Sequence, residues 1–394
     1  MCSSDLGGPL TDPAALRGQA LAVLEAHWDP ARGHCYPHGS RYPHQWLWDS
    51  CFTAICWAAL GDGRAASELQ TALSDQLEDG FVPHMRYAGP TIDRGPLGHV
   101  SSFTQPPVYA HAAVRLAGHG VELPPDLLGR IDRALRFLWV SRRDRGGLVS
   151  IVHPWESGAD DSPRWDSWLA ADWAPLRWDQ PRFTAFDLQL VGQARFNRHG
   201  AAVASTGFTV APAAFNALAG HAARELAAVG GDPRWRDRAD VLAAAVDARL
   251  WDDHQGLWSD APLVGGGPSA AVPTLDGVLP ALVTADPAKA ARAIDQLLDP
   301  ARFAAPFGLA YVARDHPKYQ PDAYWRGTAW MQMNYLAVLA ARRWGRVEVV
   351  DQVVGASRRA AVTSGFAEHW NPETSQGHGA IPLTWSALVV ALEA

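Results

Sequence analysis

Helical periodicity returns along the whole chain and constrains its fold more than any other feature. Apolar residues spaced at the 3.6-residue period of an α-helix predict helices over 13–27, 45–60, 64–76, 106–118, 123–142, 184–198, 211–229, 233–251, 271–283, 286–298, 328–344, 347–365 and 383–394. No convincing run of alternating polar and apolar residues predicts strands. The chain is therefore expected to be all-α.

The connections between these helices alternate in character. Some are short and polar, whereas others are long and rich in Gly, Pro and Trp, at 28–48, 77–105, 143–183, 252–270, 299–327 and 366–382. Long ordered loops usually carry function. Their recurrence once per helical hairpin predicts six hairpins closed in a ring, with functional loops at one end. We expect residues 13–394 to form this single domain and residues 1–12 to be poorly ordered.

Composition excludes several classes of partner. The net charge is −7, and acidic and basic residues are interspersed, so the sequence shows no basic patch for nucleic acid or an anionic membrane. The four cysteines form neither a disulfide framework nor a metal-ligand pattern, as is typical of a reducing compartment. Neither a signal peptide nor an apolar run of about 20 residues is visible. We expect a cytoplasmic protein without a bound metal, and homo-oligomerisation is left open.

One loop concentrates acidic side chains between two indoles. The segment WESGADDSPRW places Glu156, Asp160 and Asp161 between Trp155 and Trp165, and its Gly and Pro residues disfavour a helix. Apolar walls raise the pKa of a carboxyl group, which makes it usable as a general acid near neutral pH. An exposed acidic turn is the structural alternative.

Four further loop motifs lie at helix junctions. They are YPHQWLWDS at 42–50, SSFTQPPVYA at 101–110, AYWRGTAW at 323–330 and EHWNPETSQGHG at 368–379. Together they supply carboxylates, amides, a guanidinium and indole faces, which suit a sugar with its hydroxyl groups and C–H faces. Acids on two separate loops, Asp160 and Glu368, indicate glycoside hydrolysis.

Each candidate also has a structural interpretation. Trp46 and Trp48 can be core aromatics, and Asp49 can be the N-cap of the following helix. Gln105 can satisfy backbone groups at a helix start, and Arg326 can pair with an acid.

Five ordered motifs resemble glycoside hydrolase family 63. QWLWDS, TQPP, WESGxDxSPRW, YWRGxxW and an E-aromatic-aromatic-NPET segment are most similar to its bacterial branch of mannosylglycerate and glucosylglycerate hydrolases, with trehalases as more distant relatives. The resemblance runs from about Leu16 to the C-terminus. It implies an (α/α)6 barrel and an inverting α-glycosidase that needs no cofactor.

The resemblance also assigns roles to residues. Asp160 matches the general acid and Glu368 the general base, while Tyr42 matches a tyrosine that helps to hold the carboxylate of the aglycone. Residues matching positions that hold the sugar in the −1 subsite are Trp46, Asp49, Gln105, Arg326 and Gly327. The other expected substrate-binding residues are Gln45, Trp48, His84, Tyr87, Thr104, Trp155, Glu156, Gly158, Arg164, Trp325, Trp330 and Trp370. Arg86 or another basic loop residue is expected to add charge for an anionic aglycone.

Three rival functions remain open on the sequence. An α-glucosidase acting on oligosaccharides or trehalose would have an aromatic platform where a glycerate-specific enzyme has a cation and tyrosines. A sugar isomerase or epimerase on the same barrel would use histidines as acid and base, but His34, His38, His44, His84, His111 and His153 form no recognisable motif. A non-catalytic carbohydrate-binding protein is disfavoured because both acids of the catalytic pair are present.

Overall fold

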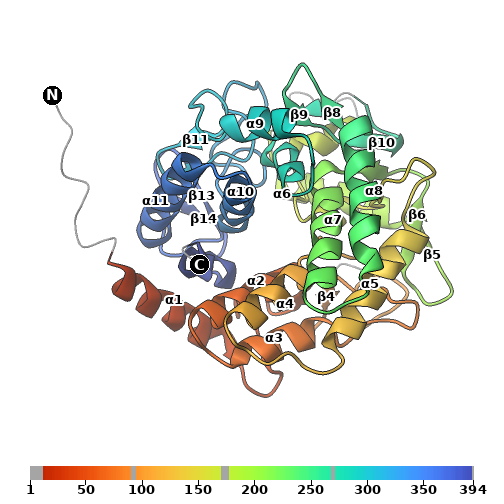
Figure 1. Ribbon diagram of the computed structural model, residues 1–394, viewed down its shortest axis with the longest axis horizontal. Helices are drawn as coiled ribbons and strands as arrows, with labels where there is room; N and C mark the ends of the chain where they lie inside the picture. Colours follow the sequence, from red (N-terminus) through yellow and green to blue (C-terminus); the bar gives the residue numbers. More distant parts are fainter. Residues whose placement is uncertain (1–11, 90–94, 170–176, 268–270, 393–394) are drawn as a thin grey trace.

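The computed structural model describes residues 12–89, 95–169, 177–267 and 271–392, and it is mostly helical (Figure 1). The α-helices are α1 (Pro13–His27), α2 (Leu47–Ala59), α3 (Arg64–Ala72), α4 (Tyr109–Gly118), α5 (Leu127–Ser141), α6 (Gln180–Val191), α7 (Ala213–Ala228), α8 (Arg234–Arg249), α9 (Pro287–Asp295), α10 (Met331–Arg343) and α11 (Val347–Thr363). The 3-10 helices are η2 (Pro154–Ser157), η3 (Pro163–Trp168), η6 (Leu275–Gly277), η7 (Leu279–Leu282) and η8 (Thr384–Ala391). The expected disorder of residues 1–12 concerns residues that, apart from Asp12, lie outside the described ranges.

Short antiparallel strand pairs cross-link the loops. The pairs are β1 (Trp28–Asp29) with β2 (His34–Cys35), β3 (Gln45–Trp46) with β4 (Met85–Arg86), β5 (Ala194–Phe196) with β6 (Ala202–Ser205), β7 (Thr209–Ala211) with β10 (Ala261–Val264), β8 (Trp251–Asp252) with β9 (Leu257–Trp258), β11 (Ala304–Ala305) with β12 (Gly308–Leu309), and β13 (His369–Trp370) with β14 (Gly377–His378). Strands of two to four residues are too short to show a period of two, so the sequence did not predict them.

Three of the predicted helices need correction. The predicted helix 271–283 is the pair of 3-10 turns η6 and η7, and Pro280, which has no N–H, stands in the second of them. The predicted C-terminal helix is the 3-10 helix η8. Helix α6 begins at Gln180 rather than 184, because Asp179 caps it by accepting a hydrogen bond from the Arg182 N–H. It ends at Val191, and the rest of the predicted helix contains β5 between two short non-helical stretches.

The helices form an inner and an outer layer. Along the inner layer α2, α4, α7, η7, α10 and η8 each pack against the next, and η8 packs back against α2. Helices α3, α8 and α11 pack outside α2, α7 and α10 respectively, as Figure 1 shows. Burial follows this division, because α2 is buried continuously from Leu47 to Ala58 whereas α8 buries a single stripe.

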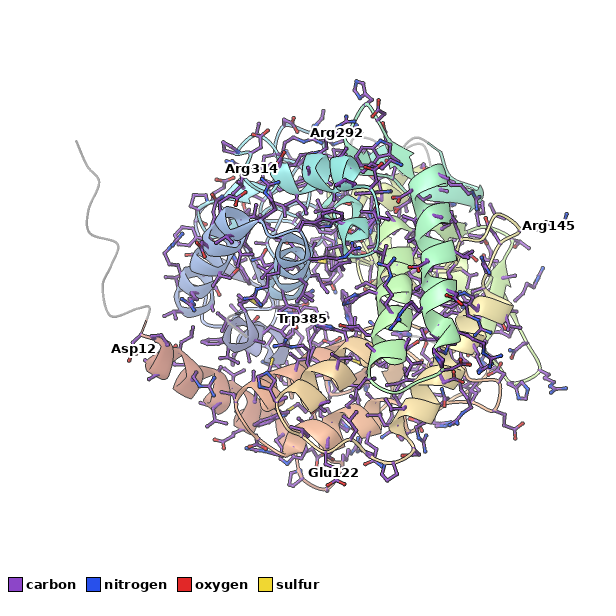
Figure 2. The ribbon with its side chains drawn as sticks, in the orientation of Figure 1. Asp12, Glu122, Arg145, Arg292, Arg314 and Trp385 are labelled. Carbon is purple, nitrogen blue, oxygen red and sulfur yellow. The ribbon has the colours of Figure 1, made fainter. Side chains whose placement is uncertain are left out.

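The core therefore lies at the centre of the molecule. In Figure 2 the side chain of Trp385, from η8, lies toward the middle, whereas Glu122, Arg145, Arg292 and Arg314 lie at the periphery. Among the described residues, no helix combines the length and apolar character needed to cross a bilayer.

Candidate active site

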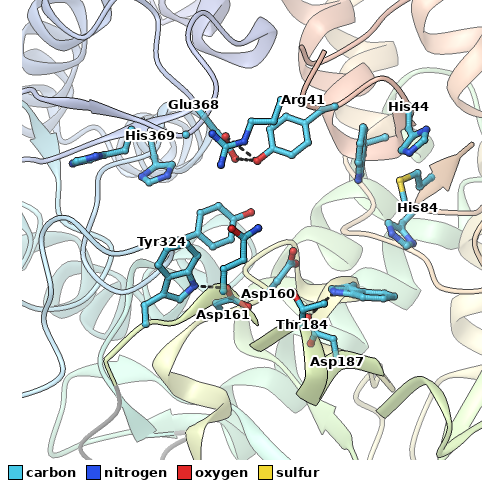
Figure 3. Close-up of a pocket in the computed structure, with 18 of the residues that line it drawn as sticks. Arg41, His44, His84, Asp160, Asp161, Thr184, Asp187, Tyr324, Glu368 and His369 are labelled. Carbon is cyan, nitrogen blue, oxygen red and sulfur yellow. Dashed lines mark hydrogen bonds between the residues drawn. The ribbon is translucent and has the colours of Figure 1, made fainter. Parts of the chain in front are cut away.

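A cavity of about 590 Å³ opens among the long loops, with α6 forming part of its wall (Figure 3). A smaller recess of about 150 Å³ adjoins it. The two share the side chains of Tyr42, Trp46, Gln105, Asp160, Tyr324 and Glu368. Residues from five separate loops thus meet around one space large enough for a small glycoside.

The loop that carries Asp160 turns sharply beneath the recess. The 3-10 helix η2 ends at Gly158, whose φ of 73° lies in the left-handed region that favours glycine. A Cβ at Gly158 would also stand 2.5 Å from Cη2 of Trp48, so no larger residue fits against this indole. Trp48 and Gly158 both line the recess, and their contact places Asp160 between the recess and the main cavity.

Asp160 is held among other carboxyl groups. Removal from bulk water raises its pKa well above the ordinary value, and the negative charges of Asp161, Asp49 and Glu368 raise it further. These surroundings therefore favour the neutral acid of Asp160, and this form can donate a proton.

Glu368 is fixed on the other side of the cavity. Its carboxylate accepts hydrogen bonds from the Tyr42 hydroxyl at 3.1 and 3.0 Å and from the Ala380 N–H at 2.9 Å. The neighbouring Gly379 leaves room for it, since a Cβ there would stand 2.3 Å from Oε2. Burial raises the pKa of Glu368 to about 7, against the two hydrogen bonds and the positive charge of Arg41, which lower it. Glu368 is thus partly ionised at neutral pH.

The two carboxyl groups have different electrostatic surroundings. Asp160 has acidic neighbours, whereas Glu368 has two hydrogen-bond donors and Arg41. A pair of carboxyls with separated pKa values can supply one general acid and one general base at the same pH.

Asp49 lies in the first turn of α2 and faces the recess. Trp46 occupies the N-cap position of α2, and its side chain makes no capping hydrogen bond. Asp49 lies inside the helix, so the interpretation of Asp49 as the N-cap is wrong. The Trp48 N–H at this helix start instead donates to Oε1 of Gln105, which comes from another loop. Burial, with the charge of Glu368, raises the pKa of Asp49 to about 8.

Aromatic rings form much of the remaining wall. The ring of Trp155 lies 6.0 Å from that of His84, and the ring of Trp46 lies 5.6 Å from that of Tyr42. The Trp155 indole N–H donates to Asp187 on α6 at 3.0 Å. The wall therefore offers indole faces next to carboxylates, which is the surface that a sugar ring requires.

Comparison with known proteins agrees with this geometry. A family model described as a mannosylglycerate hydrolase MGH1-like glycoside hydrolase domain matches residues 42–386. A mannosylglycerate hydrolase from Thermus thermophilus is 30% identical over 94% of this chain and 98% of its own length. A glucosylglycerate hydrolase from Mycolicibacterium hassiacum is 29% identical over 89% and 91%.

The chain belongs to the MGH1-like glycoside hydrolase family. It is a glycoside hydrolase, and the isomerase and the non-catalytic alternatives are thereby removed.

Solved structures extend the similarity to the fold. The family 63 mannosylglycerate hydrolase of Thermus thermophilus in complex with glucose has a TM-score of 0.79 and 28% identity, covering 96% of this chain and 99% of the other. The same enzyme in complex with Tris and D-glycerate has a TM-score of 0.76, 28% identity and coverage of 96% and 99%.

In this glycoside hydrolase, three predicted substrate-binding residues instead form buried ion pairs behind the cavity wall. Glu156 pairs with Arg142 at 2.6 Å, both side chains being fully buried. Arg164 pairs with Asp260 at 2.7 Å and with Asp276 at 2.9 Å. Arg326 donates to Asp166 at 2.7 Å and to the Asp161 carbonyl at 3.1 Å, so it takes the structural role that the sequence left open.

Three predicted tryptophans are likewise part of the packing. Trp325 and Trp330 are fully buried and stack with centroids 3.8 Å apart and planes at 8°. Trp370 is completely buried, and its N–H donates to the Phe307 carbonyl. Gly327 is needed for close packing, since a Cβ there would stand 2.6 Å from the Gln320 carbonyl oxygen.

The remaining predicted residues lie around the edge of the site. Gln45 donates to Ser50 and Thr71, and the backbone N–H of Thr104 donates to Glu156. Tyr87 packs its ring 6.0 Å from that of His44, which does line the cavity. The expectation for Arg86 is corrected, because its guanidinium donates to Asp75 and Ser74, and neither of these lines the cavity.

Several cavity residues escaped the sequence-based prediction. Arg41 stands beside Tyr42 and Tyr324 belongs to the YWRGxxW motif, which are usable signals. Gln180, Thr184 and Asp187 come from α6, whose start was placed too late. Asp187 had only one signal, an acid flanked by apolar residues within a helix.

Proposed function

We propose that this glycoside hydrolase is an inverting α-glycosidase that hydrolyses mannosylglycerate or glucosylglycerate. The observation that carries the proposal is the pair Asp160 and Glu368, which face one cavity in different electrostatic surroundings, with Arg41 also lining that cavity. The names of the relatives, which include both a mannosylglycerate and a glucosylglycerate hydrolase, support these two substrates.

In the proposed reaction Asp160 protonates the glycosidic oxygen while Glu368 removes a proton from the attacking water. Both carboxyls border the recess, which we take as the −1 subsite, and Asp49 and Gln105 there are suited to bind sugar hydroxyls. Inversion requires about 6.5–9.5 Å between the two carboxyl groups, to leave room for the water. A water held between Glu368 and the sugar would attack from the face opposite Asp160.

The aglycone is proposed to bind in the larger cavity, against Arg41. Arg41 is exposed, extends beside Glu368 (Figure 3) and lines the cavity, and its guanidinium carbon lies 5.8 Å from the centre of the Tyr42 ring. A guanidinium binds a carboxylate with two parallel hydrogen bonds, which suits the carboxylate of a glycerate. A structure of the Thermus enzyme in complex with D-glycerate supports an aglycone of this kind.

We further propose that the inner layer is the inner ring of an (α/α)6 barrel and that residues 13–394 form one domain. The return of η8 onto α2 supports closure of the ring. The buried free thiols of Cys35, Cys51 and Cys56 support a reducing, cytoplasmic location.

A second candidate is an α-glucosidase acting on trehalose or a short oligosaccharide. Trp155, Trp178 and Tyr324 line the larger cavity, and aromatic rings there could stack on a second sugar. The two candidates share the same catalytic pair and differ only in the aglycone.

Product analysis on a panel of α-glycosides tests both candidates. NMR of fresh hydrolysate should show the β-anomer of the sugar before mutarotation, and α-product first would mean retention. Glucosylglycerate or mannosylglycerate should be cleaved with a higher kcat/KM than trehalose or maltose. Asp160→Asn and Glu368→Gln should each lower kcat by about 10²–10⁴. Near-wild-type activity in either variant would remove its assigned role.

A further inference from the structure

Three side chains that the proposed reaction does not use meet in the interior between α4 and α7. His111 comes from α4, while His221 and Glu225 lie one turn apart on α7. Nδ1 of His111 lies 2.9 Å from Oε1 of Glu225, and Nε2 of His221 lies 3.3 Å from the same oxygen. None of the three is among the residues that border the catalytic cavity or its recess. The mechanism therefore does not explain why they are gathered.

The cluster has the donor set of a metal site. Its two imidazole nitrogens and one carboxylate oxygen all lie within 4.8 Å of one another, and no other group of three His, Cys, Asp or Glu residues within the described ranges does so. The side chains of His111, Glu225 and His221 are 5%, 16% and 19% exposed. A tetrahedral Zn²⁺ with bonds of about 2.0–2.1 Å would hold such atoms about 3.3 Å apart. The observed separations need little change to admit an ion.

A neighbouring hydroxyl group completes the surroundings of His111. The Tyr335 oxygen, from α10, lies 2.8 Å from Nε2 of His111. When Nε2 carries the proton and donates to Tyr335, Nδ1 is left with a lone pair directed toward Glu225. Metal-binding histidines are commonly oriented in this way by a partner on their other nitrogen.

The His221 side chain has a ring nitrogen without a hydrogen-bond partner in the protein. Its Nε2 is buried and makes no hydrogen bond, although Glu225 lies at ion-pair distance. Arg115 adds positive charge near Tyr335, which opposes a bound cation, so the affinity would have to come from direct bonds to the imidazole nitrogens and the Glu225 carboxylate.

We propose that His111, His221 and Glu225 bind one divalent transition-metal ion, with Zn²⁺ as the best fit, at a structural site separate from the catalytic cavity. The ion would join α4 to α7, and through Tyr335 it would also bear on α10. These three helices belong to the inner layer (Figure 1), so the site would stiffen the layer that supports the loops. It is independent of the proposed glycosidase substrate.

Metal binding by the full-length protein tests the proposal directly. The chain should be purified without a histidine tag, treated with chelator and titrated with Zn²⁺ or Co²⁺. We expect one equivalent by calorimetry and by elemental analysis, a Tm raised by several degrees, and the intense visible absorption of a tetrahedral Co²⁺ site. Chelator should reverse the rise in Tm.

Variants assign the binding to this cluster. His221→Ala and Glu225→Gln should abolish the metal-dependent rise in Tm, and Tyr335→Phe, which keeps all three ligands, should weaken affinity by about 10–100-fold. His254→Ala, at an exposed loop histidine, is the matched control and should bind one equivalent. If a ligand variant fails to fold, the affinity of Tyr335→Phe still tests whether the metal binds at this cluster. A protein that binds no metal, or whose binding persists in both ligand variants, would overturn the proposal and leave a buried ion pair.

Discussion

Tyr42 and Glu368 show how one hydrogen bond changes the role of a residue. The resemblance assigned Tyr42 to the aglycone carboxylate, yet its hydroxyl donates to both oxygens of Glu368. This bond favours the ionised form of Glu368 and lowers its pKa, against the burial that raises it to about 7. Tyr42 therefore acts on the proposed general base.

Replacing Tyr42 by Phe should raise the pKa of Glu368 above about 7, because the ionised form loses a donor. The acidic limb of the kcat/KM profile should move to higher pH with a glycerate substrate and with an uncharged aryl α-glucoside alike. A variant with an unchanged pH profile and a higher KM for the glycerate substrate alone would show that Tyr42 binds the aglycone.

The wild-type profile should itself be bell-shaped. Glu368 must be ionised, so activity should fall as the pH drops through about 7. Asp160 must be protonated, so activity should fall again as the pH rises through its pKa, which burial and neighbouring acids raise. An aryl glycoside with a good leaving group should lose less activity in Asp160→Asn than a glycerate substrate. Equal losses would argue against Asp160 as the acid.

Arg41 permits a test of the aglycone. Arg41→Gln should raise KM for glucosylglycerate or mannosylglycerate by about 10-fold or more, since a charge-assisted pair contributes about 1.5–3 kcal/mol. At pH 8 or above, where Glu368 is largely ionised, an uncharged aryl α-glucoside should be affected little. Arg86→Gln is the matched control, because this guanidinium is bound to Asp75 and Ser74 away from the cavity. Equal effects on both substrates would favour the trehalose or oligosaccharide candidate.

At the scale of elements, the catalytic loop depends on one buried ion pair. Glu156 in η2 binds Arg142 at the end of α5, and it also accepts hydrogen bonds from the N–H groups of Val152 at 2.7 Å and Thr104 at 3.2 Å. A single carboxylate thus holds together α5, η2 and the loop that precedes α4. The position of Asp160 follows from this arrangement.

Glu156→Ala should destabilise the protein by about 3–5 kcal/mol, because it leaves Arg142 charged, buried and unpaired. The remaining folded enzyme should also lose kcat, since the loop carrying Asp160 would shift. Chemical denaturation measures the loss of stability, and kcat per titrated active site measures the loss of activity. Glu78→Ala, at a glutamate that is 89% exposed, should change stability by less than about 0.5 kcal/mol. A loss of that small size in Glu156→Ala would contradict the anchoring role.

At the scale of the whole molecule, burial of Glu368 in the cavity lowers the free energy of unfolding. Glu368 has a folded pKa of about 7 and an ordinary value of 4.5, so its ionisation opposes folding. The destabilisation is absent below the ordinary pKa, grows as the pH rises and is complete above about 7. A shift of this size corresponds to about 3 kcal/mol.

Glu368→Gln should therefore be more stable than the wild type at pH 8, with a higher Tm in calorimetry. The gain should shrink as the pH falls and nearly vanish at pH 4, where both proteins carry a neutral side chain. The exposed variant Glu78→Gln should show no such dependence. A gain that is the same at pH 4 and pH 8 would point to packing rather than to charge.

The sequence by itself determined the helical class, most helix positions and the loops that meet at the cavity. Periodicity records which face of a helix is buried, and motif order records which loops carry acids. The sequence also singled out the Asp160–Glu368 pair and the neighbouring Trp46, Trp48, Asp49, Gln105 and Gly158, all of which border the cavity or its recess.

Only the tertiary structure decided which charged residues face the cavity and which stand behind it. Glu156, Arg164 and Arg326 are of the residue types that bind sugars, but each is buried in an ion pair with a residue of another segment. Arg41 and Arg86 are alike in sequence, and the presence of Asp75 beside Arg86 separates their roles. His111 meets His221 and Glu225 only because α4 packs on α7. Partners distant in the chain determine whether a polar side chain is satisfied internally or left to a ligand, and no local pattern records them.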